Sequence, residues 1–229
     1  MTTPKKLFIS TAALAALSIV LAPHAFGLQW RIETVDSVGD VGQSPSLAIG
    51  PDGTVQIAYR DETNDHLHYA RQSGSGWQIG TVDSPGSQGN SPSLAIDSRG
   101  RRHISYFDGT SGDLKYAAWT SWGWAIQTVD WAGKVGFVSS IALDSLDRPH
   151  IAYEDATNRA LKYVRLDDAG MWRIVTVDSN PAGNYGWFPS LALSTSDLPH
   201  IAYLDAATFQ LNYAWWAGSS WSIESLGPD

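Results

Sequence analysis

Aspartates recur at two fixed positions of a pattern that the chain repeats four times. One set closes the second apolar run of each repeat and the other closes a tryptophan-led run: Asp61, Asp108, Asp155 and Asp205, and Asp36, Asp83, Asp130 and Asp178. Carboxylates gathered on one face are oxygen ligands that Ca²⁺ accepts in flexible geometry. Ser, Gly or Ala follows most of these aspartates, which also favours Asx turns with their own backbone. Ca²⁺ therefore stays open, and we assign no metal ligand and no cofactor.

Histidines form a second set of candidate ligands. The second apolar run opens with Gln56 in the first repeat and with histidine in the others: His103, His150 and His200. A metal ring would require these imidazoles to meet near one axis, which the second strand of a repeat does not line. We therefore predict packing or hydrogen-bonding roles for them. His66 and His68, on the third run of the first repeat, are predicted to lie at the surface.

Aromatic residues gather in the links between repeats, where the repeats differ most. The first two links read SVGDVGQS and SPGSQGNS, whereas the last two read WAGKVGFV and SNPAGNYGWF. Aromatic rings beside a few polar groups are typical of ligand pockets. The candidate ligand-binding residues are Trp131, Phe137, Tyr185, Trp187 and Phe188, with Phe209 from a nearby turn and the polar Asp130, Asp178 and Asn184. Alternatively, these rings fill a central channel or pad the junctions between repeats.

Tryptophans mark the period of the elements that must position these residues. Trp30, Trp77, Trp124, Trp172 and Trp221 lie 47, 47, 48 and 49 residues apart, which indicates an array of supersecondary units. Each repeat holds four short runs rich in Ile, Val, Tyr, Trp and Thr, residues that favour strands. Gly, Asp, Ser and Pro separate the runs and predict hairpin turns. In the second repeat the strands are expected at 92–97, 103–108, 114–119 and 124–130.

The second face of each predicted strand carries small residues rather than charges. A sheet covered on both faces has this pattern, and a single four-stranded sheet cannot cover itself. Radial stacking of the sheets gives a β-propeller, whereas a sandwich would not explain the period. We predict an all-β fold, a β-propeller of four-stranded antiparallel blades at about 44–83, 91–130, 138–178 and 188–226. The repeated tryptophans are expected to pack blade against blade.

An extra strand is predicted at 29–36, where QWRIETVD matches the fourth strand of a blade. The last repeat has a fourth strand of its own, so the count does not match a closed ring of four blades. Either this strand is surplus, or the ring is open, or the chain is a piece of a longer array. Open blade edges favour association. A homo-oligomer is therefore one expected partner.

Residues 1–27 are typical of a signal peptide. Lys5 and Lys6 precede sixteen uncharged residues and the sequence PHAFG. An uncleaved anchor is the alternative, although the run is short for a membrane span. We expect a secreted protein, extracellular or periplasmic, with the propeller domain at 28–229. The formal net charge of −8 argues against nucleic acid or an anionic membrane as partner, and the absence of cysteine excludes disulfides.

The core of the repeat, PSLAID followed by HISYFD and DLKYA, resembles the tandem β-propeller repeats of secreted bacterial and archaeal surface proteins. The resemblance covers residues 29–226 and implies the blade type, but little about function. Sialidase and lectin propellers are more distant analogues. The sialidase Asp-box pattern, Ser-x-Asp-x-Gly-x-Thr-Trp, is absent from the first turns of the repeats, and no arginine triad is expected on the face with the aspartates. Sialidase chemistry is therefore not expected.

Three functions remain open at this stage. The first is a secreted binding module that recognises carbohydrate or another surface ligand through the aromatic links. The second is a glycoside hydrolase or lyase, with Glu154 and Asp155 as paired carboxylates. The third is a structural or adhesive unit that associates with its own kind. Apart from Glu154, the candidate acids recur in every repeat rather than at one site, so binding is favoured over catalysis and no catalytic residue is assigned.

Overall fold

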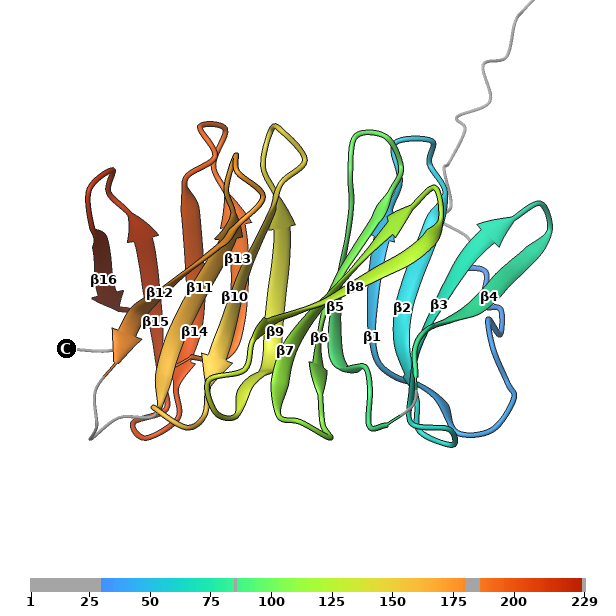
Figure 1. The fold of residues 1–229 in the computed structure, drawn as a ribbon, viewed down its shortest axis with the longest axis horizontal. Helices are drawn as coiled ribbons and strands as arrows, with labels where there is room; N and C mark the ends of the chain where they lie inside the picture. Colours follow the sequence, from blue (N-terminus) through green and yellow to red (C-terminus); the bar gives the residue numbers. More distant parts are fainter. Residues whose placement is uncertain (1–29, 85, 180–185, 228–229) are drawn as a thin grey trace, which may run out of the picture. The chain divides into compact units, whose positions relative to one another are not determined.

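Every repeat folds into one four-stranded antiparallel sheet in the computed structural model, which describes residues 30–84, 86–179 and 186–227. In each sheet the strands pair in chain order, and we call the sheets blades 1 to 4 (Figure 1). The all-β fold of four-stranded blades is confirmed. The strands are β1 (Val41–Ile49), β2 (Val55–Asp61), β3 (His66–Ser73) and β4 (Gly76–Asp83) in blade 1; β5 (Asn90–Ile96), β6 (Arg102–Asp108), β7 (Asp113–Thr120) and β8 (Gly123–Asp130) in blade 2; β9 (Val135–Leu143), β10 (Pro149–Asp155), β11 (Ala160–Leu166) and β12 (Trp172–Ser179) in blade 3; and β13 (Trp187–Leu193), β14 (Pro199–Asp205), β15 (Gln210–Trp216) and β16 (Trp221–Ser225) in blade 4.

All four blades belong to one compact unit, Thr34–Asp229, and Met1–Glu33 is a separate unit. The predicted signal peptide, 1–27, lies outside the described residues. The prediction of an extra strand at 29–36 is wrong for the part that the structure describes, since 30–36 contains no strand. A fourth strand needs the third strand of its own blade as a partner, and each described blade already has a fourth strand. No helix in the described ranges is long and apolar enough to cross a membrane.

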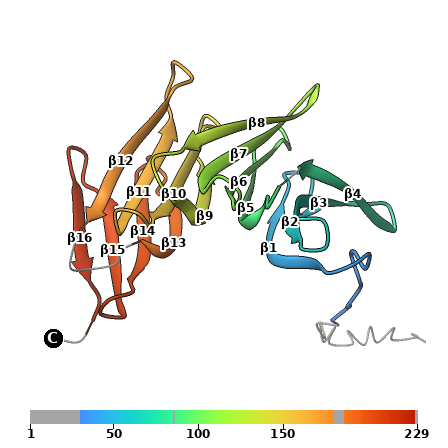
Figure 2. The ribbon, with the colours of Figure 1, turned by 60° about the horizontal axis from the view of Figure 1, so that its bottom comes forward.

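Consecutive blades lie side by side (Figures 1 and 2), and the core of the protein lies between them. The first strands β1, β5, β9 and β13 lie next to one another in that order. Three clusters of buried residues fill the junctions, one per pair of blades, and include Leu67 with Ile104, Leu114 with Ile151, and Leu161 with Ile201. Blades 2 and 3 therefore contribute one face to each of two junctions, blades 1 and 4 contribute a face to one junction each, and the buried clusters lie between blades rather than within them.

Glycine near the start of the first strand permits this close packing. A Cβ atom on Gly136 would lie 2.7 Å from the Leu114 Cβ, and Gly136 has a φ of +84°. Gly89 meets Leu67 of blade 1 at the same distance, with a φ of +78°. Any larger residue would meet both a steric clash and an unfavourable backbone conformation.

Aromatic rings extend each junction toward the outer strands. The tryptophan that opens a fourth strand packs edge-on against a tyrosine of the preceding blade, with ring centroids 5.1 to 5.5 Å apart: Trp124 on Tyr69, Trp172 on Tyr116 and Trp221 on Tyr163. Edge-to-face pairs of this kind add to the area that they bury. The prediction that the repeated tryptophans pack blade against blade is confirmed for Trp124, Trp172 and Trp221, and it is wrong for Trp30, which is 92 % exposed.

The same tyrosines hold the histidines that open the second strands. His103 Nδ1 lies 2.5 Å from the Tyr116 hydroxyl, and His150 Nδ1 bonds Tyr163 in the same way. In blade 1, Gln56 accepts from Tyr69 instead. Burial lowers the pKa of His103 and His150, although a nearby aspartate acts in the opposite direction. The predicted hydrogen-bonding role of these histidines is confirmed.

The repeated aspartates serve the backbone and the junctions. Tyr153 of blade 3 donates a 2.7 Å hydrogen bond to Asp130 of blade 2, and Lys162 Nζ lies 2.8 Å from the same carboxylate. The strand-end aspartates of the other set cap turns, as Asp108 does by accepting from the Thr110 amide at 2.9 Å. The Asx-turn interpretation is therefore confirmed for these residues.

Acidification is expected to weaken the junctions through Asp130. Burial raises the pKa of this carboxyl. The hydrogen bonds from Lys162, the Ala132 amide and Tyr153 lower it by more than burial raises it, so the net shift is downward. The folded-state pKa then lies below the unfolded value of about 3.9, so the stabilisation is complete above about pH 4 and is lost as the pH falls through the folded pKa. Asp130→Asn should cost about 3–5 kcal/mol at pH 7, measured by urea unfolding, and flatten the loss below pH 4. Asp168→Asn, at an 88 % exposed side chain, is the control. Equal stability of the two variants at pH 7 would contradict this account.

Candidate functional site

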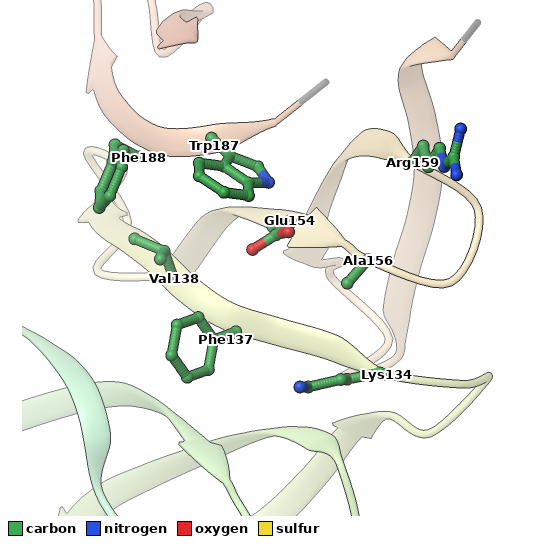
Figure 3. A pocket seen from close by; sticks show the side chains of 8 residues that line it. All are labelled: Lys134, Phe137, Val138, Glu154, Ala156, Arg159, Trp187 and Phe188. Carbon is green, nitrogen blue, oxygen red and sulfur yellow. The ribbon is translucent and has the colours of Figure 1, made fainter. Parts of the chain in front are cut away.

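A pocket of about 380 Å³ opens where blades 3 and 4 meet (Figure 3). Blade 4 supplies two aromatic residues, and blade 3 with its preceding link supplies the rest: Trp187 and Phe188, and Lys134, Phe137, Val138, Glu154, Ala156 and Arg159. Figure 3 shows the Glu154 carboxylate between the rings of Trp187 and Phe137. The pocket thus combines an aromatic surface with one carboxylic acid, Glu154, and two basic side chains, Lys134 and Arg159.

The backbone of β13 turns Phe188 outward. A register shift interrupts the pairing of β13 with β14 between Trp187 and Ser190, and Phe188 has a φ of +48°. Ser44 and Ser91 have the same conformation at the corresponding place in blades 1 and 2, each with a φ of +47°. A bulky residue in left-handed backbone is uncommon, and the Phe188 ring remains 64 % exposed. The protein therefore covers little of this ring, which contacts Trp187 and lines the pocket.

The pocket exists because one position of the second strand varies among the blades. In blade 1 the position holds Arg60, which is buried and donates to the Gln88 carbonyl at 3.0 Å. In blade 2 it holds Phe107, which packs edge-on against Phe137 with centroids 5.4 Å apart. In blade 3 the shorter Glu154 leaves space beside Trp187.

Glu154 is the chemically distinctive residue of the pocket. Its exposed fraction is 6 %, and burial raises the pKa of its carboxyl. A hydrogen bond from Trp187 and the charge of Lys134 act in the opposite direction, while Asp155 adds to the rise. The carboxyl can accept hydrogen bonds when ionised and donate one when protonated.

Lys134 and the paired rings complete the pocket wall. The Lys134 Nζ atom lies 5.6 Å from the centroid of the Phe137 ring, within reach of a cation–π contact. The rings of Trp187 and Phe188 meet edge to face, with centroids 6.0 Å apart. A ligand here would meet aromatic faces and, beside them, both a donor and an acceptor.

The structure brings only part of the predicted set together. Phe137, Trp187 and Phe188 line the pocket. Trp131 and Phe209 are 71 % and 79 % exposed, and neither is among the residues that line it. Trp131 lies in the link after β8 and Phe209 in the turn before β15, where the described residues leave both rings largely uncovered.

The predicted polar partners lie elsewhere. Asp130 is 4 % exposed and holds the junction of blades 2 and 3, and Asp178 accepts from Tyr203 of blade 4. Asn184 and Tyr185 lie outside the described residues. Sequence reasoning did not assign Glu154, Lys134 or Arg159 to this ligand site. The signal for Glu154 was its position, which changes residue type from blade to blade while its neighbours repeat.

A second hollow of about 360 Å³ lies near the other end of the strands of blades 3 and 4. Arginines and aromatic residues line it, among them Arg148, Arg165, Arg173, Trp216 and Trp221. The guanidinium groups of Arg148 and Arg173 are paired with Asp144 and Asp167, both at 2.6 Å. We take the first pocket as the candidate site, because it contains the residue that changes from blade to blade, Glu154.

Comparison with known proteins shows the fold. No protein-family model and no curated protein matches the sequence. Among solved structures, the chain is similar to an exo-β-1,3-galactanase from Phanerochaete chrysosporium, with a TM-score of 0.54 and 12 % identity over 85 % of this chain and 52 % of that chain. It is also similar to the Aleuria aurantia lectin, with a TM-score of 0.53 and 17 % identity over 80 % of this chain and 61 % of that one. A third similar structure is an α-L-arabinofuranosidase from Fusarium graminearum, with a TM-score of 0.52 and 14 % identity over 81 % of this chain and 66 % of that chain. The chain thus spans about half the length of the galactanase chain, and its membership of a tandem-repeat family stays a prediction.

The raised pKa of Glu154 predicts that its ionisation costs stability. A carboxyl whose folded pKa exceeds its unfolded pKa destabilises the fold progressively as the pH rises through the unfolded value, about 4.3. Glu154→Gln should therefore unfold at higher urea concentration than the parent chain at pH 7, and the difference should vanish at pH 3. Glu224→Gln, at an exposed position, should show no such gain. A gain that persists unchanged at pH 3 would refute the role of ionisation.

Proposed function

We propose that this chain is a carbohydrate-binding propeller and that the sugar enters the pocket of Phe137, Glu154 and Trp187. The observation that carries the proposal is the hydrogen-bonding carboxyl of Glu154 between aromatic rings. It lies at the one described junction where neither an arginine nor a phenylalanine of the second strand fills the space. We also propose that the chain is exported, because residues 1–27 have the pattern of a signal peptide.

A sugar matches the two kinds of surface in the pocket. One face of a pyranose ring is largely C–H, which packs on an aromatic ring such as Trp187, while its hydroxyls need donors and acceptors at the edge. Glu154 offers the acceptor and Lys134 offers the donor. The galactanase structure contains galactose and the lectin structure contains a fucose disaccharide, which supports a sugar as ligand.

Binding is better supported than hydrolysis. Glycoside hydrolysis normally needs two carboxyl groups about 5 to 9.5 Å apart on either side of the bond that breaks. Among the described residues that line the pocket, Glu154 is the only acid. Its neighbour Asp155 has no exposed surface and is held by Asn158 and Lys162.

Truncation of the pocket rings should weaken sugar binding. A glycan array would first identify a ligand for the parent chain, and titration calorimetry would then compare variants. Trp187→Ala is expected to weaken binding by at least about tenfold, which corresponds to about 1.4 kcal/mol, because it removes both a stacking face and the hydrogen bond to Glu154. Trp122→Ala, at a 96 % exposed tryptophan in a turn of blade 2, is the matched control. The site is wrong if both variants bind equally well, and the function is wrong if no glycan binds the parent chain.

The outer faces of blades 1 and 4 favour a second role, self-association. Leu211 of blade 4 is 49 % exposed, whereas Leu67, Leu114 and Leu161 at the corresponding position are fully buried in junctions. Leu47 of blade 1 is 59 % exposed, although its counterparts in the other blades are no more than 8 % exposed. Each end of the row of blades therefore presents one half of a junction.

Blade 1 retains the hollow that receives a leucine in the other junctions. The hollow has a volume of about 180 Å³, and Gly42, Ile57 and Tyr59 contribute to its lining. Gly42 keeps a φ of +89°, but a Cβ atom there would meet nothing within 4 Å. In the junctions that are formed, the corresponding glycine lies against a leucine of the preceding blade.

The uncovered face of blade 1 also has the polar contact that the formed junctions contain. Tyr59 donates to Asp36 at 2.6 Å, as Tyr153 does to Asp130. The fourth strand of blade 4 has Gly227 where the other fourth strands end in aspartate. We propose that blade 4 of one copy docks head to tail on blade 1 of the next, with Asp36 as the carboxylate of the new junction.

Charge at Leu211 should prevent this association. Multi-angle light scattering of the parent chain is expected to show dimers or larger species, and Leu211→Asp should yield monomers because it places a charge in an apolar junction. Leu146→Asp, at a 67 % exposed leucine in a turn of blade 3, should leave the parent mass unchanged. A parent chain that stays monomeric at high concentration would rule the association out, without bearing on the sugar site.

A further inference from the structure

In blades 2 and 3, one lysine of each blade bridges two carboxylates. Lys115 Nζ lies 2.7 Å from Asp83 and 3.6 Å from Asp108. Lys162 Nζ lies 2.8 Å from Asp130 and 3.1 Å from Asp155. In each bridge one aspartate ends the preceding fourth strand and the other ends the second strand of the lysine's own blade. The ammonium group compensates two largely buried negative charges.

Blade 1 keeps both carboxylates but replaces the lysine with His68. The Nε2 atom of His68 lies 3.6 Å from Asp61 Oδ2, and its Nδ1 atom lies 4.0 Å from Asp36 Oδ2. The side chains of Asp36 and Asp61 are only 11 % and 2 % exposed. An imidazole carries a positive charge only when protonated, so the position has lost its permanent cation.

A second imidazole accompanies this replacement. His66 begins β3 directly opposite Asp61 in the ladder, and His68 follows on the same face of the strand. One ligand atom each of Asp61, His66 and His68 lies within 4.8 Å of the others. The corresponding residues of the other blades are Asp113, Ala160 and Gln210, so only blade 1 pairs two histidines here.

We propose that Asp61, His66 and His68 bind a divalent transition metal ion, with Zn²⁺ as the best match to two imidazoles and a carboxylate. Zinc takes such ligands at about 2.0–2.2 Å, and a water molecule commonly completes the tetrahedron. The metal supplies the positive charge that Lys115 and Lys162 supply in the next two blades. Ca²⁺ is disfavoured because it selects oxygen ligands.

The surroundings of His68 suit a metal ligand. Its Nδ1 atom is buried and has no hydrogen-bond partner, although it faces Asp36. Histidines that bind metals usually donate their second N–H to a carboxylate, and Asp36 is placed to accept it after a small shift. Thr81 Oγ1 lies 3.2 Å from Nε2 and would give up this contact when the metal binds. Asp36 is itself held by Tyr59. The prediction from sequence that His68 is a surface residue is wrong, since its side chain is 16 % exposed.

The repeats themselves provide the variants that test the site. Titration calorimetry with ZnCl₂ on the full chain, free of any histidine tag and treated with a chelator, should show one ion per chain. His68→Lys restores the ammonium of blades 2 and 3 and should weaken zinc binding by more than about 100-fold while preserving the melting temperature of the metal-free chain. His66→Gln, the residue of blade 4, should also weaken binding.

His103→Gln is the matched control, because blade 1 has Gln56 at that position and His103 lies in the junction core. It should bind zinc like the parent chain. Co²⁺ provides a second readout, since tetrahedral coordination gives visible absorption that His68→Lys should abolish. The proposal fails if the parent chain does not bind zinc, or if His68→Lys binds it as well as His103→Gln does.

Discussion

Each blade is stable because a neighbouring blade covers it. A four-stranded sheet of about forty residues cannot bury its apolar faces alone, and here the buried clusters lie between sheets rather than within them. Leu67, Leu114 and Leu161 lose all their exposed surface at these junctions, whereas Leu211 at the end of the row does not. Hydrogen bonds from a tyrosine of one blade to an aspartate of the preceding blade then join the two blades across the junction.

This constraint explains why most repeated polar residues are structural. A carboxylate at the end of a fourth strand and a tyrosine on the next blade form a pair that recurs at each of the three junctions. A lysine joins this pair at the first two junctions, and blade 4 has Asn212 in its place. Departures from the repeat are therefore informative, because the junction tolerates few of them. Glu154 in place of Arg60 or Phe107 opens a pocket, and His68 in place of Lys115 or Lys162 removes a cation.

The proposed sites occupy different blades and use different chemistry. The sugar pocket combines aromatic faces and one carboxyl at the junction of blades 3 and 4, while the metal site uses imidazoles and a carboxylate of blade 1. The hollow around Gly42 on blade 1 borders Asp36, which also faces His68. A metal ion bound by Asp61, His66 and His68 would orient His68, and His68 would then hold Asp36 in the position that the proposed head-to-tail junction requires.

The sequence by itself determined the blades, their strands, the hydrogen-bonding role of the repeated histidines and the packing role of Trp124, Trp172 and Trp221. These features depend on local alternation, on turn residues and on a fixed period, all of which are visible without coordinates. The sequence also placed Phe137, Trp187 and Phe188 near one another, because links between blades meet on one face. Only the tertiary structure decided that Glu154 lines a pocket while Trp131 and Phe209 stay exposed, and that 30–36 forms no strand. A pocket depends on which side chain fills the space between two blades, and a strand depends on a free edge. Both are properties of neighbours that are distant in the chain.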